Sequence, residues 1–484
     1  MSEQPSEHTF AVDLRGLVDL LSQHLYTSPR VYLRELLQNG VDAITARCAI
    51  DPDAPGRVTI RTGDGLTAHD TGIGLTEAEV HDLLATIGRS SKRGDFETAR
   101  QDFLGQFGIG LLAAFVVAEQ ILVVSRSFRP DAEVVEWRAF ADGSYTVRTL
   151  PDSDHPEPGT TIHLQPRRGS EEWFGHDRVA ELAREFGSLL PYPITVDGRA
   201  INAERPPWEA PPSADRTVAL AAYCRENLGF DPLESITLDV PLVGIRGVAY
   251  VLPTAVSPTQ RGGHRVHLKG MLLTERAESL LPPWAFFVRC VIDTTGLRPT
   301  ASREALYEDD TLAAVRDALG GQIRGWLERL AVESPQRLRR FLAVHELGVR
   351  ALAAHDPEVL RLMLPWLRFE TTLGSLSLEE LATQDRVIHF TRTVEEYRQI
   401  AGIAGVQGIA VVNCGYTYHS TLVEMLPQLM PGARVAELET STVSAYLDGV
   451  DSADELAFAE LLAVARTKLD GLDCDVALRA FHPA

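Results

Sequence analysis

Three side chains between Tyr32 and Ala43 carry groups suited to holding or activating a ligand. Glu35, Asn39 and Asp42 are spaced i, i+4 and i+7, so a helix would place two carboxylates and an amide on one face. The pair Asn39-Gly40 is unfavourable inside a helix and more often marks a turn. A helix that keeps this pair therefore needs the amide, and it needs close approach of another element at the glycine.

The other face of this predicted helix is apolar, and its stripe consists of Leu33, Leu36, Leu37 and Ile44. A stripe at this spacing predicts packing of the helix against a sheet. The alternative interpretation is a surface helix with a solvated polar face. That face lacks the Glu-to-Lys pairs that such helices tend to use, which disfavours the alternative.

A second candidate segment follows a predicted strand at 66–69. Asp70 ends this strand and is followed by Thr71-Gly72-Ile73-Gly74-Leu75. The two glycines let the backbone approach a ligand closely, while Asp70 offers an acceptor beside it. The alternative is an ordinary hairpin turn, because Asp and Gly both favour turns. The third glycine of a Rossmann fingerprint, which would open a helix, is missing.

A third candidate segment is rich in glycine and precedes the apolar residues 111–118, which we expect to be helical. It consists of Gly105, Gln106, Phe107, Gly108, Ile109 and Gly110. Glycines ahead of a helix can form an anion cradle, because free N–H groups point outward where the helix dipole is positive. The alternative is a glycine hinge packed against the sheet. The Lys-Ser or Lys-Thr ending of a P-loop is absent.

The rest of the pattern predicts an α+β chain. Helices are expected at 12–25 and, behind a capping box at 76–79, up to residue 87. Alternation predicts strands at 57–61, 121–125, 145–149, 160–164, 236–242, 245–252 and 266–273. Residues 308–369 have helical spacing, and a small α/β unit follows, with strands at 387–390, 409–412 and 435–438 and helices at 394–400 and 421–430. A last helix is expected at 456–469 and a last strand at 476–480.

Composition argues against several classes of partner. The chain has 46 Lys and Arg against 67 Asp and Glu, which gives a formal net charge of −21. Nucleic acids and anionic membranes are bound by clustered basic residues, so we expect neither as a partner. The five cysteines form no CxxC pair, which predicts no zinc site and no disulfide framework and fits the cytoplasm. Neither a signal peptide nor an apolar run of ~18 residues is evident.

Taken in order, the three candidate segments and Gly159-Thr160 on a later strand resemble a known nucleotide site, that of the gyrase, histidine-kinase and MutL-type ATPase superfamily. Residues 10–43, the run from Thr86 to Ser90 and the glycine-rich segment are similar to one family in particular, the heat shock protein 90 chaperones of the bacterial type. This resemblance implies that the first domain is a two-layer α/β sandwich of the Bergerat type.

The resemblance also implies a role for each candidate residue. Glu35 would be the general base that activates the attacking water, and Asn39 would hold Mg²⁺ on the phosphates of ATP or ADP. Asp70 would accept from the adenine amino group, helped by a water on Thr160. The other implied nucleotide contacts are Asp42, Gly74, Leu75, Arg89, Ser90, Gly105, Gln106, Phe107, Gly108, Ile109 and Gly110. Residues 75–110 would close over ATP as a lid.

A later stretch, from Leu273 through Trp284 to Glu304, resembles the middle domain of the same family. By this resemblance, Arg303 reaches the γ-phosphate when the two domains dock, since a guanidinium fork matches charge spread over phosphate oxygens. The alternative is that Arg303 and Glu304 are surface charges in the first turn of a helix.

The proline-rich stretch 206–212 marks a domain boundary. We expect an ATP-binding domain at 1–205 and an α/β middle domain at 206–445. The middle domain would have two sub-units, 206–335 and 381–445, joined by a helical connector at 336–380. Residues 446–484 would begin a C-terminal domain whose dimerisation part is missing.

Five positions depart from the family pattern. They are Leu83 for Asn, Arg89 for Lys, Leu111 for Phe, Thr300 for Asn and Tyr307 for Gln. The first three lie where ribose and phosphates would be held, and the last two flank Arg303, so slow turnover is expected.

Three hypotheses follow for the function. The first is an ATP-dependent chaperone of the stress response that acts on unfolded or partly folded client proteins. The second is a MutL-type DNA-repair ATPase, and the third is a nucleotide-binding scaffold with little hydrolysis. The family forms homodimers through the missing domain, so this chain is expected to be a monomer or a weak dimer.

Overall fold

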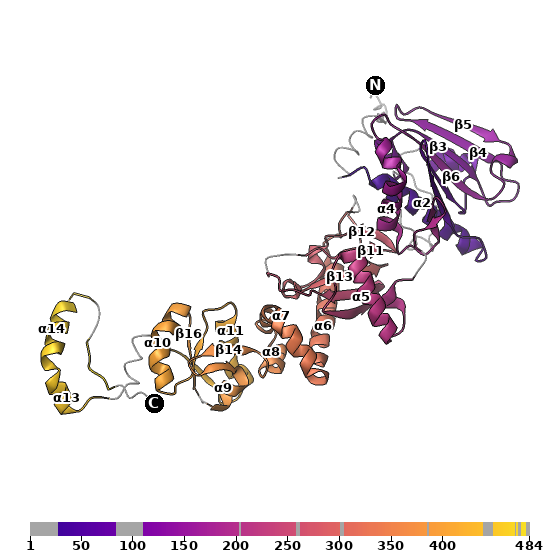
Figure 1. Cartoon of the computed structure of the whole chain (residues 1–484). Coiled ribbons are helices and arrows are strands. Elements are labelled where there is room, and N and C mark those ends of the chain that lie inside the picture. Colours follow the sequence, from indigo (N-terminus) through magenta and orange to yellow (C-terminus); the bar gives the residue numbers. More distant parts are fainter. Residues whose placement is uncertain are drawn as a thin grey trace, which may run out of the picture. The chain divides into compact units, whose positions relative to one another are not determined.

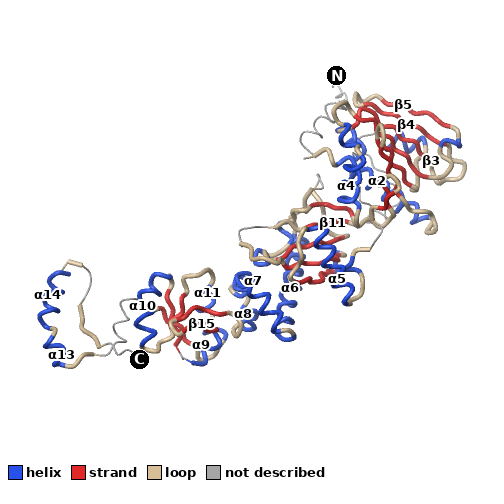
Figure 2. Tube along the Cα trace, in the orientation of Figure 1, coloured by secondary structure: helices blue, strands red, loops and turns tan. Residues whose placement is uncertain are grey.

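The computed structural model describes residues 28–83, 110–202, 205–257, 262–300, 304–384, 387–438, 449–469, 471–472 and 476–480. The described residues form three β-sheets with helices packed on them (Figures 1 and 2). The first two sheets belong to one compact unit and the third belongs to another. The helix expected at 12–25 lies outside the described residues. In the described part of the chain, no helix combines the length and the apolar character of a membrane span.

The first sheet has eight strands in the order β5-β4-β3-β6-β2-β1-β7-β8. These strands are β1 (Val58–Thr62), β2 (Leu66–Asp70), β3 (Ala118–Arg126), β4 (Val134–Phe140), β5 (Tyr145–Leu150), β6 (Gly159–Pro166), β7 (Ile194–Val196) and β8 (Arg199–Ala200). Neighbouring strands are antiparallel, except that β1 and β7 run parallel. Alternation predicted five of the eight strands and missed β4, β7 and β8.

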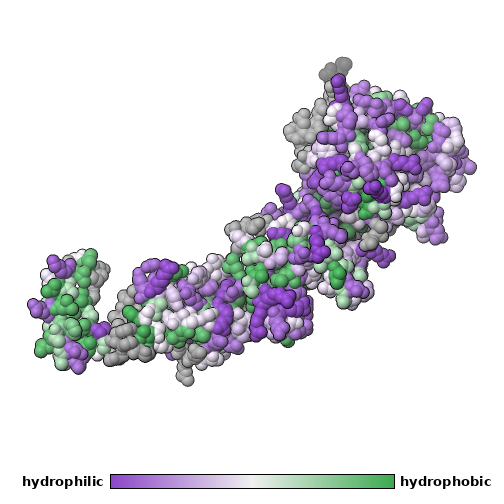
Figure 3. All heavy atoms as spheres, viewed as in Figure 1, coloured by the Kyte–Doolittle hydropathy of each residue, from purple (hydrophilic) through white to green (hydrophobic). Residues whose placement is uncertain are grey.

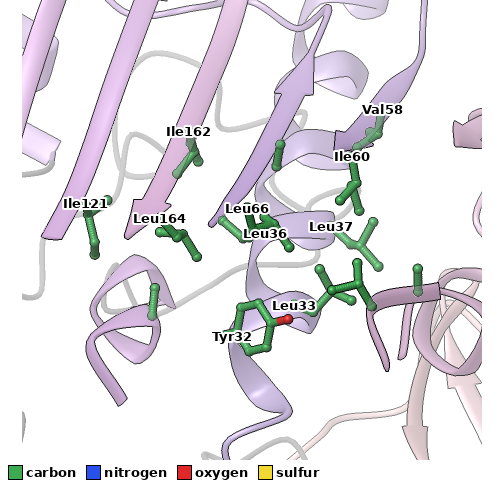
Figure 4. Close-up of a cluster of buried hydrophobic side chains, with 14 of the residues drawn as sticks. Tyr32, Leu33, Leu36, Leu37, Val58, Ile60, Leu66, Ile121, Ile162 and Leu164 are labelled. Carbon is green, nitrogen blue, oxygen red and sulfur yellow. The ribbon is translucent and has the colours of Figure 1, made fainter. Parts of the chain in front are cut away.

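Helices cover the apolar face of this sheet, which makes the expected two-layer sandwich. The longest is α2 (Val31–Ile50), and α4 (His176–Gly187) packs beside it. The apolar stripe of α2 enters a core that includes Val58, Ile60 and Leu66 of the neighbouring strands (Figure 4). The shorter helical segments of this layer are α3 (Glu77–Leu83) and the 3₁₀ turns η4 (Gly110–Val116), η5 (Asp152–Asp154) and η6 (Glu171–Phe174).

Of two further helices expected in this domain, the first is present as far as Leu83, beyond which its predicted end lies outside the described residues, and the second is wrong. Thr76 and Glu79 make the predicted capping box, with Thr76 N donating to Glu79 Oε2 at 2.8 Å and Glu79 N donating to Thr76 Oγ1 at 3.4 Å. The helix expected at 111–118 is instead the 3₁₀ turn η4, and β3 begins at Ala118. A short apolar run fits a buried helix and a buried strand equally well, so its spacing could not fix this boundary.

The second sheet has the order β12-β11-β13-β10-β9. Its strands are β9 (Glu234–Val240), β10 (Ile245–Val251), β11 (Arg265–Leu268), β12 (Met271–Thr274) and β13 (Val288–Thr294). The helical segments in this part of the chain are α5 (Ala214–Leu228) and the 3₁₀ turns η7 (Pro207–Glu209), η8 (Pro241–Val243), η9 (Glu278–Leu280) and η10 (Pro283–Ala285). The single strand expected at 266–273 is wrong. Lys269 and Gly270, both at positive φ, form a turn between β11 and β12, and a lysine is a weak turn signal.

The third sheet has the order β15-β14-β17-β16-β18. Three helices precede it along the chain: α6 (Asp310–Glu333), α7 (Pro335–Ala353) and α8 (Pro357–Met363). Its strands are β14 (Arg368–Thr371), β15 (Gly374–Ser377), β16 (Val387–Thr391), β17 (Val411–Asn413) and β18 (Arg434–Glu437). The helices between these strands are α9 (Leu378–Gln384), α10 (Val394–Val406), α11 (His419–Glu424) and α12 (Leu426–Leu429). The helical connector expected up to 380 is wrong beyond α8. The β14–β15 hairpin begins there, because Phe369 and Thr371 alternate into the core.

The last described segment holds α13 (Ser452–Ala457) and α14 (Ala459–Leu469) in place of one predicted helix. Apolar side chains such as Leu456 and Leu461 are exposed on these helices (Figure 3). The strand expected at 476–480 is wrong, since the structure assigns only a bridge at Ala480 to this segment.

Candidate functional site

Helix α2 is confirmed where the sequence predicted it, and its polar side chains are buried along with its apolar ones. Glu35 and Asp42 are each 5% exposed, and Asn39 is half-buried. Leu33 and Leu37 are fully buried in the core of the first domain. The alternative of a solvated polar face is therefore wrong, because burying two carboxylates is unfavourable unless other groups compensate them.

Arg34 supplies compensation for Glu35. Its Nη2 lies 3.2 Å from Glu35 Oε1, and its Nε donates to the same oxygen at 3.4 Å. Both side chains are nearly free of solvent contact, so the guanidinium holds the carboxylate in a fixed place. The sequence reasoning missed Arg34, since adjacent residues on a helix do not normally face each other.

Gly40 explains the unfavourable Asn-Gly pair inside α2. A Cβ atom on Gly40 would lie 3.2 Å from Val58 Cγ2 and 3.4 Å from Asp70 Cβ. The helix therefore crosses the ends of β1 and β2 closely at this residue, and a side chain there would be in tight contact with both strands. This close approach brings the middle of α2, next to Asn39, beside Asp70.

The loop after Asp70 is held against α2 by one backbone and one side-chain hydrogen bond. Ile73 N donates to Ala43 O at 3.0 Å, and Arg47 Nη1 donates to Thr71 O at 2.9 Å. Gly74 has a φ of +64°, and a Cβ atom there would lie 1.8 Å from Arg126 O on β3. The second glycine of the motif is thus required by the fold of the loop itself.

The Asp70 carboxyl is 7% exposed, and burial raises its pKa to about 7. The backbone N–H groups of Gly72 and Thr160 act in the opposite direction, and the Gly72 donor lies 2.8 Å from Oδ1. An ionised carboxylate has about four acceptor positions, so two amides leave capacity for another donor. An amino group of a ligand is a donor of the kind that this free acceptor position of Asp70 takes.

Thr160 lies opposite Asp70 in the antiparallel pair of β2 and β6. Both side chains are on the buried face, and Thr160 Oγ1 is 2.9 Å from Ser125 Oγ on β3. Gly159 precedes Thr160 with a φ of +147°, and a Cβ atom there would lie 2.2 Å from Asp70 O. The Gly-Thr pair is therefore required to bring β6 this close to Asp70. Ser125 was not singled out from the sequence, where it only ended a predicted strand.

Several predicted site residues lie outside the described residues. They are Arg89, Ser90, Gly105, Gln106, Phe107, Gly108, Ile109 and Arg303. Gly110 begins η4, which packs against α2, and Leu111 lies half-buried at the edge of the same core. Helix α2 therefore contacts both the strand that carries Asp70 and the turn that follows the glycine-rich segment.

The segment on either side of Arg303 is tied together by backbone hydrogen bonds. Thr300 N donates to Ala305 O at 2.9 Å, and Tyr307 N donates to Arg298 O at 2.8 Å. Helix α6 begins only at Asp310. The alternative that Glu304 lies in the first turn of a helix is therefore wrong.

The described residues contain no group of three or more His, Cys, Asp or Glu side chains arranged to hold a metal ion. This finding leaves open the expectation for Asn39, because Mg²⁺ on a nucleotide needs few protein ligands.

Comparison with known proteins identifies the class of the first domain. Residues 26–153 match the family model described as histidine kinase-, DNA gyrase B-, and HSP90-like ATPase. The match includes α2, the Asp70 loop and the Ser125 strand. Residues 26–153 are therefore similar to the ATPase domains of this class.

Matches over most of the chain show similarity to one particular kind of protein within the class. The chaperone protein HtpG of Chlorobium chlorochromatii is 27% identical over 76% of this chain and 62% of its own length. The HtpG proteins of Nitratidesulfovibrio vulgaris and a Methylobacterium species are 27% and 30% identical over 80% and 77% of the chain. The chain is accordingly similar to HtpG proteins over about three quarters of its length. It spans 62% to 66% of the length of these three curated relatives.

Proposed function

We propose that this chain is an ATP-dependent molecular chaperone, as the names of its curated relatives suggest. The observation that carries the proposal is the buried acceptor pair of Asp70 and Thr160 beside the acidic helix α2. A purine amino group fits that pair, and Glu35 lies on the same helix that passes Asp70. Binding of ATP would close a lid at 75–110, and hydrolysis would reopen it.

In this proposal each residue has a defined task. Glu35 is the general base for the attacking water, and Asp42, Gly74 and Leu75 line the base pocket. Arg89, Ser90 and the run Gly105, Gln106, Phe107, Gly108, Ile109 and Gly110 hold the phosphates. Asn39 holds Mg²⁺, which would neutralise charge on the phosphates. Arg303 supplies a further cation from the second domain.

The proposal extends to domains, partners and location. The ATP-binding domain would cover 1–205, the middle domain 206–445 and the start of a C-terminal domain 446–484. Unfolded or partly folded proteins would be the clients, and the chain would act in the cytoplasm as part of the stress response. The net charge of −21 supports the absence of nucleic-acid partners.

Replacement of Glu35 by alanine tests the mechanism. We expect ADP to bind the variant, while steady-state ATP turnover falls roughly a hundredfold or more. Glu136→Ala is the matched control, because Glu136 is also a buried, ion-paired glutamate of the first domain, with Arg148 as partner at 2.8 Å. Turnover at the wild-type rate in Glu35→Ala would show that the base is another residue. Failure of the wild-type chain to bind ADP in calorimetry would overturn the function itself.

A further inference from the structure

Ser125 connects three parts of the candidate base site through one hydroxyl group. Leu75 N donates to Ser125 Oγ at 2.9 Å, and Ser125 Oγ donates to Gly159 O at 3.0 Å. The same oxygen lies 2.9 Å from Thr160 Oγ1. The side chain has no exposed surface, so water does not compete for these contacts.

The direction of each hydrogen bond follows from the chemistry of the partners. A carbonyl oxygen only accepts, so the single hydroxyl hydrogen of Ser125 is used on Gly159. A backbone N–H only donates, so Leu75 takes one lone pair of the serine oxygen. The remaining contact with Thr160 then needs a hydrogen from Thr160. The hydroxyl of Thr160 is thereby committed, and only its lone pairs are left for a ligand.

This polarity makes the base site an acceptor site. Thr160 and Asp70 are opposite each other in the β2–β6 register, and side chains paired in this way are near neighbours on one face. The carboxylate and the threonine oxygen therefore offer lone pairs side by side. A ligand with an amino group at this position is satisfied, whereas a ligand with a carbonyl oxygen there faces only acceptors.

We infer that Ser125 is a positioning residue that sets base specificity by orienting the Thr160 hydroxyl. The inference rests on the proposed function, since it concerns the base of the bound nucleotide. Without the serine oxygen, the Thr160 hydroxyl is free to rotate and donate its hydrogen to a carbonyl. The site then loses its preference for a 6-amino purine over a 6-oxo purine.

The test compares ADP with IDP, which carries an oxo group in place of the 6-amino group and a hydrogen on the neighbouring N1, on the full chain at pH 8. Calorimetric affinities are measured for the wild type, Ser125→Ala and Ser125→Thr. We expect the wild type to prefer ADP by about a hundredfold or more, as sites with dedicated polar partners do. Ser125→Ala lowers this ratio at least about tenfold, and Ser125→Thr, which keeps a hydroxyl, restores it. A merely structural role would weaken both nucleotides alike and leave the ratio unchanged.

Two controls keep the test decisive. Ser127→Ala removes a buried hydroxyl two residues further along, whose partner is Arg129 N at 3.4 Å, and it should leave the ratio unchanged. Thr160→Val removes the group that Ser125 orients, so it should lower the ratio by itself and abolish any further effect of Ser125→Ala.

Three outcomes separate the inference from the proposal beneath it. A folded Ser125→Ala variant with the wild-type ratio would overturn the inference. If that variant does not fold, a wild-type ratio in Thr160→Val would overturn it instead. A wild-type chain that binds neither nucleotide would overturn the proposed function.

Discussion

Two aspartates, one in each of the first two sheets, share a local arrangement. Asp70 ends β2, and burial raises its pKa to about 7, while burial of Asp293 near the end of β13 raises its pKa to about 6. Each carboxyl accepts a hydrogen bond from a glycine, Gly72 at 2.8 Å and Gly270 at 2.7 Å. Asp70 also accepts from the backbone N–H of Thr160, and Asp293 also accepts from that of Thr294.

The surroundings distinguish the two carboxyl groups. Asp293 closes the turn between β11 and β12, since its glycine donor is part of that turn. Asp70 lies opposite Thr160, whose hydroxyl Ser125 orients, and α2 passes Asp70 closely at Gly40. A buried carboxyl with a raised pKa is thus not sufficient to define a ligand site. The neighbouring acceptor and the close approach of α2 are what set Asp70 apart.

The largest expected effect concerns the two glycine donors. A Cβ atom on Gly72 would lie 2.4 Å from Ala43 Cβ, and one on Gly270 would lie 2.4 Å from Leu189 O at a φ of +80°. We expect Gly72→Ala and Gly270→Ala each to lower the free energy of unfolding by roughly 3 kcal/mol or more, because backbone has to move. Urea denaturation measures this change.

Gly198→Ala is the matched control for the glycine variants. Gly198 also has a φ of +80°, but no atom lies within 4 Å of the place that a Cβ atom would take. Its cost should be about 1 kcal/mol, from backbone conformation alone. Equal losses in all three variants would show that close packing at the aspartates is not the cause.

The next effect is the pH dependence of stability. Both carboxyl groups have folded pKa values above the unfolded value near 3.9, so the folded state binds more protons and stability falls as pH rises. For Asp70 the loss runs from about pH 4 to pH 7, and for Asp293 from about pH 4 to pH 6. The Asp70→Asn variant lacks the part of this stability loss that comes from the Asp70 carboxyl.

Between pH 5 and pH 8, Asp70→Asn should therefore gain about 2–3 kcal/mol relative to the wild type, and Asp293→Asn about 1–2 kcal/mol. Urea denaturation at the two pH values gives both differences. A variant that gains nothing would mean that its carboxyl is already ionised at pH 5.

Nucleotide affinity should separate the two aspartates completely. Asp70→Asn should weaken ADP binding by about thirtyfold or more, since a charged acceptor is lost from the site. Asp293→Asn should leave binding unchanged. In the wild type, affinity should rise about tenfold from pH 6 to pH 8, because the ionised carboxylate accepts from the amino group. Calorimetry at both pH values measures this, and equal losses in the two variants would contradict the comparison.

The smallest effect is expected for two helix caps, those of α3 and α10, which should behave alike. Thr76 begins α3 in the first domain and Thr393 begins α10 beside the third sheet, each with a capping box. Thr76→Ala and Thr393→Ala should each cost about 1 kcal/mol, measured by urea denaturation. A much larger loss at Thr76 would mean that this cap supports more than its own helix.

Much of the fold followed from local pattern. The stripe Leu33, Leu36 and Leu37 predicted the buried helix, and alternation predicted most of the strands of the first two sheets. One error arose where a turn is formed by residues that predict a turn only weakly, as at Lys269-Gly270. Another arose at the β14–β15 hairpin, where a helical pattern was extended over a segment that pairs with β17.

The candidate site was predictable only in part. Glu35, Asn39, Asp42 and Asp70 were identified by type and spacing, and the structure brings α2 and Asp70 together at Gly40. Arg34 and Ser125 were missed, because their importance depends on contacts across a helix surface and between strands. The roles of all the candidate site residues stay predictions, and Arg89, Ser90, most of the glycine-rich run and Arg303 also lie outside the described residues.

The sequence by itself determined which groups are available: an acidic helix with one glycine, a carboxyl before a glycine loop, and a threonine after a glycine. Residue types and short spacings are enough for that, since helix and strand periodicity act over a few residues. Only the tertiary structure decided which hydroxyl hydrogen points where. That choice depends on three strands and a loop meeting at Ser125, and no local pattern records such a meeting.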